Sequence, residues 1–484
     1  MSSSSDQSST TMEPVGRFAG GTEYSWCKSV PSGTGITVMS FLLSRDIEKQ
    51  TVESAVQFLQ NCHPILRARI VFDSSQSNYL FNLSSSYTRV LYFDESETAN
   101  ITSSCRNGGG IDLSEGTVLE RFHLILEHEL NKNDWSAEGE EKTNDLLVAS
   151  IYALGGGHNA LMLRAHTAVC DRSSAVTLMR ELQVLIAADY EDGDREKLAG
   201  EVGYNLEIEK LIPADKAKKP FWMRGVDVLG YSLNSFRFSS IDFVDTASKR
   251  LSQVVRLEMS RDDTQKLLTE CQSRSIKLCG VLVAASFIAA RSTKNLPIDR
   301  REKFAAVTLI DCRSILDPSL QSNQMGFYHS AIMNSHDVTG NEELWQLASR
   351  CYTSFANGKK NNKHFTDMKD VNFLMNMAID KPSLTISGAM RTTFISVFEE
   401  SVIESSSNSQ SRAAGIVDYV GCSSVHGIGP SIAIFDTLRD GELDCACVYP
   451  SPLHTREQME KLVDNMKTIL LNGSGSSTLT NGLC

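Results

Sequence analysis

The fold of this 484-residue chain is decided by the stretch Leu161-Met-Leu-Arg-Ala-His166-Thr167-Ala-Val-Cys-Asp171-Arg172. Its first residues are apolar apart from one arginine, which is typical of a buried strand. A helix is expected to start near Ser173, so the strand delivers His166 and then Asp171 to the head of that helix. A histidine at a strand end, followed by a carboxylate, is one way in which proteins position a general base.

Two orientations of His166 are compatible with this stretch. Neighbouring side chains on a strand point to opposite faces, so His166 and Thr167 face opposite ways. If Thr167 faces a cleft, His166 points into the protein and is a structural histidine. A bulge at the strand end would instead turn His166 toward the cleft. We expect an active enzyme with His166 at the edge of the site, and Thr167 as a hydrogen-bonding group, because a hydroxyl is a poor base near neutral pH.

Composition and charge indicate a soluble globular protein, with 41% hydrophobic and 22% charged residues. The net charge of −12 argues against nucleic-acid or anionic-membrane partners. The longest apolar run, Leu278 to Ala290, is too short to span a membrane and predicts a buried helix. Scattered cysteines and a Ser-rich start without an apolar signal segment predict a cytoplasmic protein with reduced thiols.

Hydrophobic periodicity predicts alternating strands and helices along both halves of the chain. The expected strands are Gly35–Leu43, Leu66–Phe72, Phe122–Leu130, Leu146–Leu154, Ser252–Met259, Phe304–Ile310 and 440–449. The expected helices run from about Ile47 to Cys62, from Ser173, over Asp262–Ser273, over Cys279–Ala290 and from Thr455 to about Asn472. Ser173 or Ser174 is expected to cap the second of these helices, and Thr455 with Gln458 is expected to form a capping box at the last.

The same pattern divides the chain into five parts, because 484 residues exceed one ordinary core. The expected parts are a disordered tail over 1–17, a first lobe over 18–215, a crossover over 216–251, a second lobe over 252–472 and a flexible tail over 473–484.

The stretch around His166 resembles the His-His-x-x-x-Asp-Gly signature of the superfamily that comprises condensation domains, BAHD enzymes and chloramphenicol acetyltransferase. The resemblance spans about Gly21 to Leu471 and is greatest to plant condensation-domain-containing proteins of the alcohol-acyltransferase type. It also rests on four further segments: His63-Pro-Ile-Leu-Arg67, Val307–Arg313, Met325–Ser330 and Tyr449–Leu471. The Asp-Phe-Gly-Trp-Gly block of BAHD enzymes is missing, and its nearest counterpart is His426-Gly-Ile-Gly-Pro430.

The resemblance implies an α/β fold, a two-lobed chloramphenicol-acetyltransferase-like sandwich with a substrate tunnel between the lobes. It also implies that Asp171 pairs with Arg313, beside Asp311, and so holds the active-site turn. The superfamily's catalytic base is the second histidine of the signature, where this chain has Thr167.

Another histidine could replace the missing base. His329, followed by Ser330, lies where the superfamily's tunnel wall is expected, and His426 lies in a glycine-flanked loop of the second lobe. For both histidines, an ordinary polar residue of a loop or strand is the alternative interpretation.

The function implied is acyl transfer in plant specialised metabolism, from a coenzyme A thioester to a small alcohol or amine. The expected partners are therefore an acyl donor and an acceptor, with acyl-coenzyme A as co-substrate, no bound cofactor or metal, and a monomeric chain. Two alternatives stay open: a lyase, cyclase or isomerase in the same tunnel, or a non-catalytic binding or scaffold protein. Polar groups converging on a cleft would favour an enzyme over a scaffold.

Overall fold

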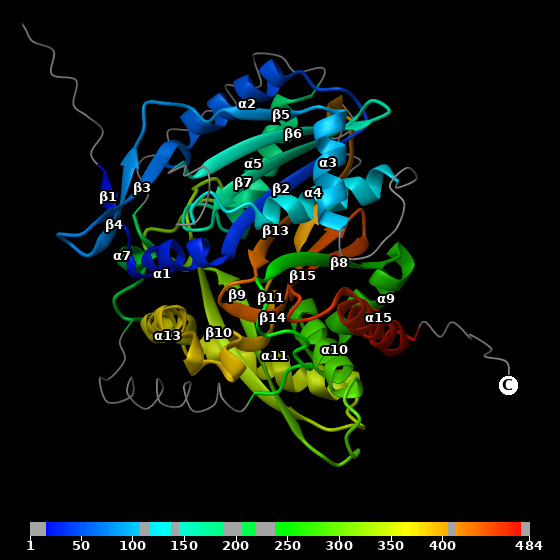
Figure 1. The fold of residues 1–484 in the computed structure, drawn as a ribbon. Helices are drawn as coiled ribbons and strands as arrows, with labels where there is room; N and C mark the ends of the chain where they lie inside the picture. Colours follow the sequence, from blue (N-terminus) through cyan, green and yellow to red (C-terminus); the bar gives the residue numbers. More distant parts are fainter. Residues whose placement is uncertain are drawn as a thin grey trace, which may run out of the picture.

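The computed structural model describes residues 16–106, 117–136, 145–187, 206–217, 238–404 and 413–475. Most of the two terminal tails and of the crossover predicted over 216–251 lies outside these residues. The chain forms two lobes built on two mixed sheets, as Figure 1 shows with the first lobe above the second. The α/β, two-lobed architecture expected from the sequence is therefore confirmed.

The first lobe is built on a five-stranded sheet of order β13-β2-β7-β6-β5. Its strands are β2 (Thr34–Leu43), β5 (Val90–Phe93), β6 (Leu147–Gly155), β7 (His158–His166) and β13 (Ile416–Val425). β2 and β7 run antiparallel, with Ile36 opposite His166. All ten residues of β2 are buried, because helices or other strands cover both faces of the sheet.

Helices cover both faces of this sheet. They are α2 (Lys49–Cys62), α3 (Glu95–Arg106), α4 (Val118–Asn131) and α5 (Arg172–Leu185). The strand expected over Phe122–Leu130 is wrong, since these residues form part of α4. Phe122, Ile125, Leu126 and Leu130 are all buried, and their spacing of three to four residues is that of a helix face.

The second lobe is built on a seven-stranded sheet with the order β10-β9-β11-β14-β15-β8, in which β12 also pairs with β14. Its strands are β8 (Leu251–Met259), β9 (Glu302–Asp311), β10 (His329–Val338), β11 (Arg391–Phe398), β12 (Val402–Glu404), β14 (Gly429–Arg439) and β15 (Glu442–Ser451). Four helices pack against it: α9 (Arg261–Ser273), α10 (Leu278–Ser292), α11 (Leu344–Lys360) and α15 (Arg456–Gly473). α10 is the buried helix expected from the apolar run.

The remaining elements are short. A three-stranded sheet consists of β1 (Arg17–Phe18), β3 (Ala68–Asp73) and β4 (Asn78–Leu83). The small helices are α1 (Gly21–Ser29), α7 (Ile208–Leu211), α12 (Lys363–Thr366) and α13 (Met368–Asp380). α1 packs on α13, so a segment of each half of the chain meets at one side of the molecule.

β13 does not follow the expected division into lobes. It lies within the range predicted as the second lobe, 252–472, yet it pairs along its length with β2 of the first sheet. Without β13, the apolar strand β2 would be the edge of its sheet and would present unpaired backbone groups. The second half of the chain therefore supplies the strand that covers the edge of β2 in the sheet of the first lobe.

Among the helices that the structure describes, none is by itself long and apolar enough to cross a membrane. Only α9 and α10 taken together pass such a test, and they are bent by 107° at the break between them.

Candidate active site

The predicted motif forms a tight turn between β7 and α5. After β7 ends at His166, the amide of Val169 donates to the His166 carbonyl at 3.0 Å and the amide of Cys170 to the Thr167 carbonyl at 3.2 Å. This turn places Asp171 at the start of α5, where its carboxylate accepts from the Ser174 amide at 2.9 Å. The cap of α5 is therefore Asp171, and the expectation of a serine cap is wrong, because the carboxylate reaches the free amides of the first turn.

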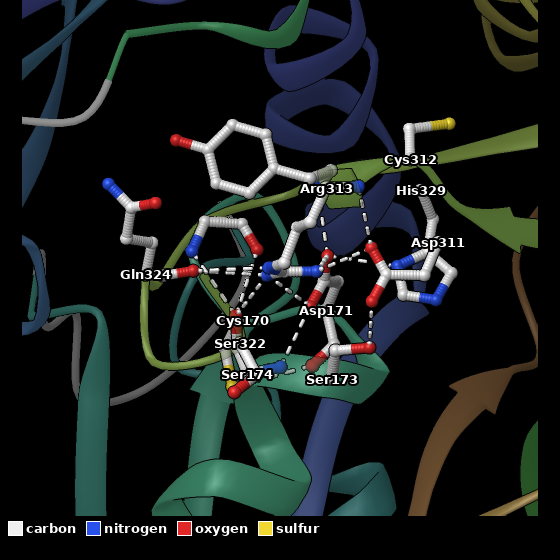
Figure 2. A network of polar contacts seen from close by, with 12 residues as sticks. Cys170, Asp171, Ser173, Ser174, Asp311, Cys312, Arg313, Ser322, Gln324 and His329 are labelled. Carbon is white, nitrogen blue, oxygen red and sulfur yellow. Dashed lines mark hydrogen bonds and ion pairs between the residues drawn. The ribbon is translucent and has the colours of Figure 1, made fainter. Parts of the chain in front are cut away.

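Asp171 is the centre of a buried polar network, drawn in Figure 2. The guanidinium of Arg313 donates to both carboxylate oxygens, at 2.9 and 3.0 Å, and both residues are 3% exposed. The expected Asp171–Arg313 pair is thus present in bidentate form. The Tyr328 amide donates to the same carboxylate at 2.8 Å. Burial alone would raise the pKa of Asp171, but Arg313 and His329 hold it well below its ordinary value.

Asp311 braces the arginine from the other side. Its carboxylate accepts from the backbone amide of Arg313 at 3.0 Å and from the guanidinium at 3.1 Å. It also accepts from the hydroxyl of Ser173 on α5 at 2.6 Å, so it ties the end of β9 to the start of α5. Asp311 therefore supports the network without lining the cavity.

His329 is the histidine that reaches Asp171. Its Nδ1 lies 2.9 Å from the Asp171 carboxylate, although the two residues are 158 positions apart in sequence. Because Asp171 is ionised and accepts from every neighbour, Nδ1 of His329 must carry the proton. In the neutral ring Nε2 is then unprotonated, and no described residue donates to it. The ring lies between Phe327 and Phe398, with centroid distances of 6.2 and 5.7 Å.

A cavity of about 420 Å³ separates the two lobes. His329, Asp171 and Thr167 all line it, together with largely apolar side chains of both sheets. Thr167 belongs to a chain of hydroxyls in the wall: its Oγ1 lies 2.8 Å from that of Thr37, which lies 2.9 Å from that of Ser423. When Thr37 accepts from Ser423 and donates to Thr167, the Thr167 proton is left for a substrate oxygen.

His166 faces away from this cavity and is not among its lining residues. It is 1% exposed, its Nδ1 accepts from the Ala168 amide at 3.2 Å, and its ring packs edge-on against Trp135 at 5.2 Å. Burial lowers the pKa of His166 to about 3. The expectation of His166 at the edge of the site is therefore wrong. The strand keeps its alternation without the bulge, so Thr167 faces the cavity and His166 faces Trp135.

Two further candidates also lie outside the cavity wall. Ser330 alternates with His329 on β10, so its hydroxyl points the other way and donates to the His364 carbonyl. His426 is half-buried, and its Nδ1 lies 3.0 Å from the hydroxyl of Ser252. Burial and the nearby Arg391 lower the pKa of His426 to about 4. Neither residue lines the cavity, so the expectation for both is wrong.

Several lining residues were not expected from the sequence. Thr37 and Phe41 share one face of β2, which strand alternation could have shown. Ser423 and Arg391 carry no such signal, because their positions depend on β13 joining the first sheet and on the start of β11. Among the described residues, no group of three or more His, Cys, Asp or Glu side chains could hold a metal ion.

No family model and no curated protein matches the sequence. Solved structures match it by fold. The trichothecene 15-O-acetyltransferase TRI3 from Fusarium sporotrichioides has a TM-score of 0.65 and 13% identity, with 94% of each chain covered. The first condensation domain of the calcium-dependent antibiotic synthetase has a TM-score of 0.59 and 12% identity, with 97% of this chain and 99% of that chain covered. The epimerization domain from the third module of tyrocidine synthetase B has a TM-score of 0.58 and 12% identity, with 96% and 99% covered.

The chain therefore has the condensation-domain and chloramphenicol-acetyltransferase-like fold. At 12–13% identity this similarity establishes the fold alone. These neighbours include an acetyltransferase and an epimerization domain, so one fold serves different reactions. The function of this chain has to be argued from its own site.

Proposed function

We propose that this protein is an acyltransferase-like enzyme in which His329 is the general base. The observation that carries the proposal is that His329 lines the cavity while its Nδ1 donates to the buried, ionised Asp171 at 2.9 Å. A histidine oriented by a carboxylate, with its other nitrogen unprotonated, is suited to take a proton from a nucleophile. His329 thus supplies, from the opposite lobe, the base that Thr167 cannot supply.

The reaction proposed joins an acceptor hydroxyl or amine to an acyl group held as a coenzyme A thioester. Nε2 of His329 takes the acceptor proton while the acceptor oxygen or nitrogen forms a bond to the thioester carbonyl carbon. The tetrahedral intermediate then breaks its carbon–sulfur bond, and the thiolate leaves with the proton held by His329. Asp171 stabilises the imidazolium between these steps through the Nδ1–H hydrogen bond.

Two further features support an enzyme over a scaffold. The space between the lobes is open, and the hydroxyls of Thr167, Thr37 and Ser423 converge on it with His329. A filled or wholly apolar interface would favour a scaffold. We further propose that the donor is acyl-coenzyme A, that the chain acts as a cytoplasmic monomer on small molecules, and that it serves specialised metabolism of the plant type.

The test is to incubate purified full-length protein with mixed acyl-coenzyme A donors and a plant metabolite extract, and to identify acylated products by mass. His329→Gln should lower turnover by about 10²–10⁴, the usual effect of losing a general base. His426→Gln is the matched control, because that histidine is also largely shielded from solvent but lies outside the cavity wall.

Equal turnover in the His329→Gln variant and the unmodified protein would contradict the proposal, as would a loss confined to His426→Gln. A new compound that forms without an acyl donor and has the same mass as its precursor would favour an isomerase or cyclase over an acyltransferase.

A further inference from the structure

Arg391 is a buried cation without an anionic partner. It stands at the first position of β11, lines the cavity and is 3% exposed. Its Nε donates to the Ala389 carbonyl at 3.0 Å, and its Nη1 donates to the carbonyls of Val425 and Pro430 at 2.9 and 2.5 Å. Its Nη2 is buried and has no partner. Among the described residues no carboxylate forms an ion pair with it.

The absence of an ion pair matters because a buried charge is costly unless an opposite charge compensates it. The described acidic residues of the cavity wall, Asp171 and Glu404, pair with Arg313 and Arg180. The neighbouring Arg250 makes the region more positive, since its guanidinium donates to the same Ala389 carbonyl at 2.7 Å. This end of the cavity therefore suits an anionic group brought by a ligand.

Two hydroxyls beside Arg391 also lack partners. Thr34 Oγ1 and Thr393 Oγ1 are buried, line the cavity and have no hydrogen bond. Nη1 of Arg391 and the Cγ2 methyl of Thr34 both approach Gly429, each 3.9 Å from where a Cβ would stand, so the two side chains border the same glycine. A guanidinium N–H with nearby hydroxyl donors is a common arrangement for binding an oxyanion.

The strand geometry places this end of the cavity far from His329. Arg391 begins β11 and Phe398 ends it, and the Phe398 ring packs on His329. Seven residues of strand rise about 20 Å, which the two side chains shorten. The wall between consists mainly of apolar side chains from three strands: Val307, Leu309, Ala331, Met333, Ala433 and Phe435.

We propose that the cavity takes an elongated, largely apolar molecule whose terminal carboxylate, or another terminal oxyanion, is bound by Arg391. Its hydroxyl then lies at the opposite end, beside His329. The position of the hydroxyl beside His329 rests on the proposed acyl transfer. The oxyanion site itself is argued only from Arg391, Thr34 and Thr393.

The experiment is a calorimetric titration of full-length protein with 10-hydroxydecanoate and with its methyl ester, which has the same chain but no charge. We expect the acid to bind at least tenfold tighter than the ester. Arg391→Gln should weaken acid binding about 10–100-fold, remove this preference and leave ester binding unchanged. Arg250→Gln is the comparison variant: it removes a neighbouring positive charge that does not line the cavity, so it should weaken acid binding less than Arg391→Gln and keep a preference for the acid over the ester.

Equal binding of acid and ester to the unmodified protein, or binding of neither, overturns the proposal without any variant. If Arg391→Gln does not fold, Arg391→Lys keeps the charge and should keep part of the preference. Decyl phosphate in place of the acid distinguishes a phosphate from a carboxylate terminus. Loss of coenzyme A binding in Arg391→Gln, with the acid preference intact, would assign the guanidinium to the donor and overturn the proposal.

The two proposals fail separately. His329→Gln should keep the preference for 10-hydroxydecanoate over its methyl ester, even where turnover is lost. Acid binding without any acyl transfer would contradict the proposed function alone, and equal turnover of acid and ester would contradict the oxyanion site alone.

Discussion

At the scale of single residues, His166 and Asp171 of the motif have different tasks. Asp171 accepts from Arg313, His329 and two backbone amides, so its buried charge is compensated on all sides. His166, five positions earlier, is shielded by Trp135 and stays neutral. Asp171 holds the site together and orients the proposed base, whereas His166 packs against Trp135 away from the cavity.

The neutral, buried His166 predicts a pH-dependent stability. Its folded pKa of about 3 lies below the ordinary value of 6.5, so an unfolded chain binds a proton that the folded chain excludes. The contribution of neutral His166 to the free energy of unfolding is therefore complete above pH 6.5. It decreases by up to about 1.4 kcal/mol per pH unit as the pH falls toward 3. His166→Asn keeps an acceptor for the Ala168 amide but does not titrate.

We expect His166→Asn to be less stable than the unmodified protein at pH 7, because ring packing is lost, and the difference to shrink by about 2 kcal/mol at pH 5. Urea unfolding of both proteins at pH 7 and pH 5 measures the difference in their free energies of unfolding. A difference in unfolding free energy that is the same at both pH values would contradict the burial argument.

At the scale of elements, α15 forms as the sequence predicts on most of its apolar face but not at its cap. The spacing predicts a buried face of Met459, Leu462, Val463, Met466 and Ile469. The first four are buried, whereas Ile469 is half-buried and Leu470 is buried in its place. The expected capping box is only half formed. Thr455 Oγ1 accepts from the Gln458 amide at 3.2 Å, but the Gln458 side chain donates to the Asp242 carbonyl at 2.9 Å. The tertiary contact uses the side-chain N–H of Gln458, and its Oε1 atom does not accept from the Thr455 amide as a capping box would require.

Thr455→Ala should destabilise the protein by about 1 kcal/mol, because one amide of the first turn of α15 loses its acceptor. Thr455→Ser keeps the acceptor and should stay within about 0.5 kcal/mol of the unmodified protein. Chemical unfolding monitored by circular dichroism compares the three. Equal stability of the alanine and serine variants would show that the cap contributes nothing.

At the scale of the whole molecule, β13 makes the lobes depend on each other. It pairs with β2 over residues 34 to 43, so the first sheet is complete only when the second half of the chain is folded. The polar network adds a second link, since Asp171 comes from the first lobe and Arg313 and His329 from the second. Both links border the cavity, and the position of the proposed base therefore depends on how the lobes meet.

A fragment of residues 1–217 is expected to be insoluble when expressed alone, because β2 would be an exposed apolar edge. Co-expression with residues 218–484 should recover soluble protein that contains both pieces, as size-exclusion chromatography would show. A monomeric, cooperatively unfolding 1–217 fragment would contradict this dependence.

The sequence by itself determined the features that rest on local periodicity and on short-range geometry. The buried strand β2, the apolar helix α10 and the face of α15 follow from spacing alone, since burial selects apolar residues at fixed intervals. Alternation also required His166 and Thr167 to face opposite ways. The Asp171–Arg313 pair was expected only through the family resemblance, and this ion pair is present in the structure.

The tertiary structure alone decided which residues meet across the lobes. The orientation of His166 away from the cavity goes with its packing against Trp135, 31 positions earlier in the chain. Phe122 to Leu130 form a helix where the sequence pattern predicts a strand. Which histidine reaches Asp171 depends on the end of β10 lying beside the start of α5, 158 positions away. Ser423 and Arg391 reach the cavity through β13 and β11. Such contacts leave no periodic trace in the sequence, because they arise between segments whose local patterns are independent.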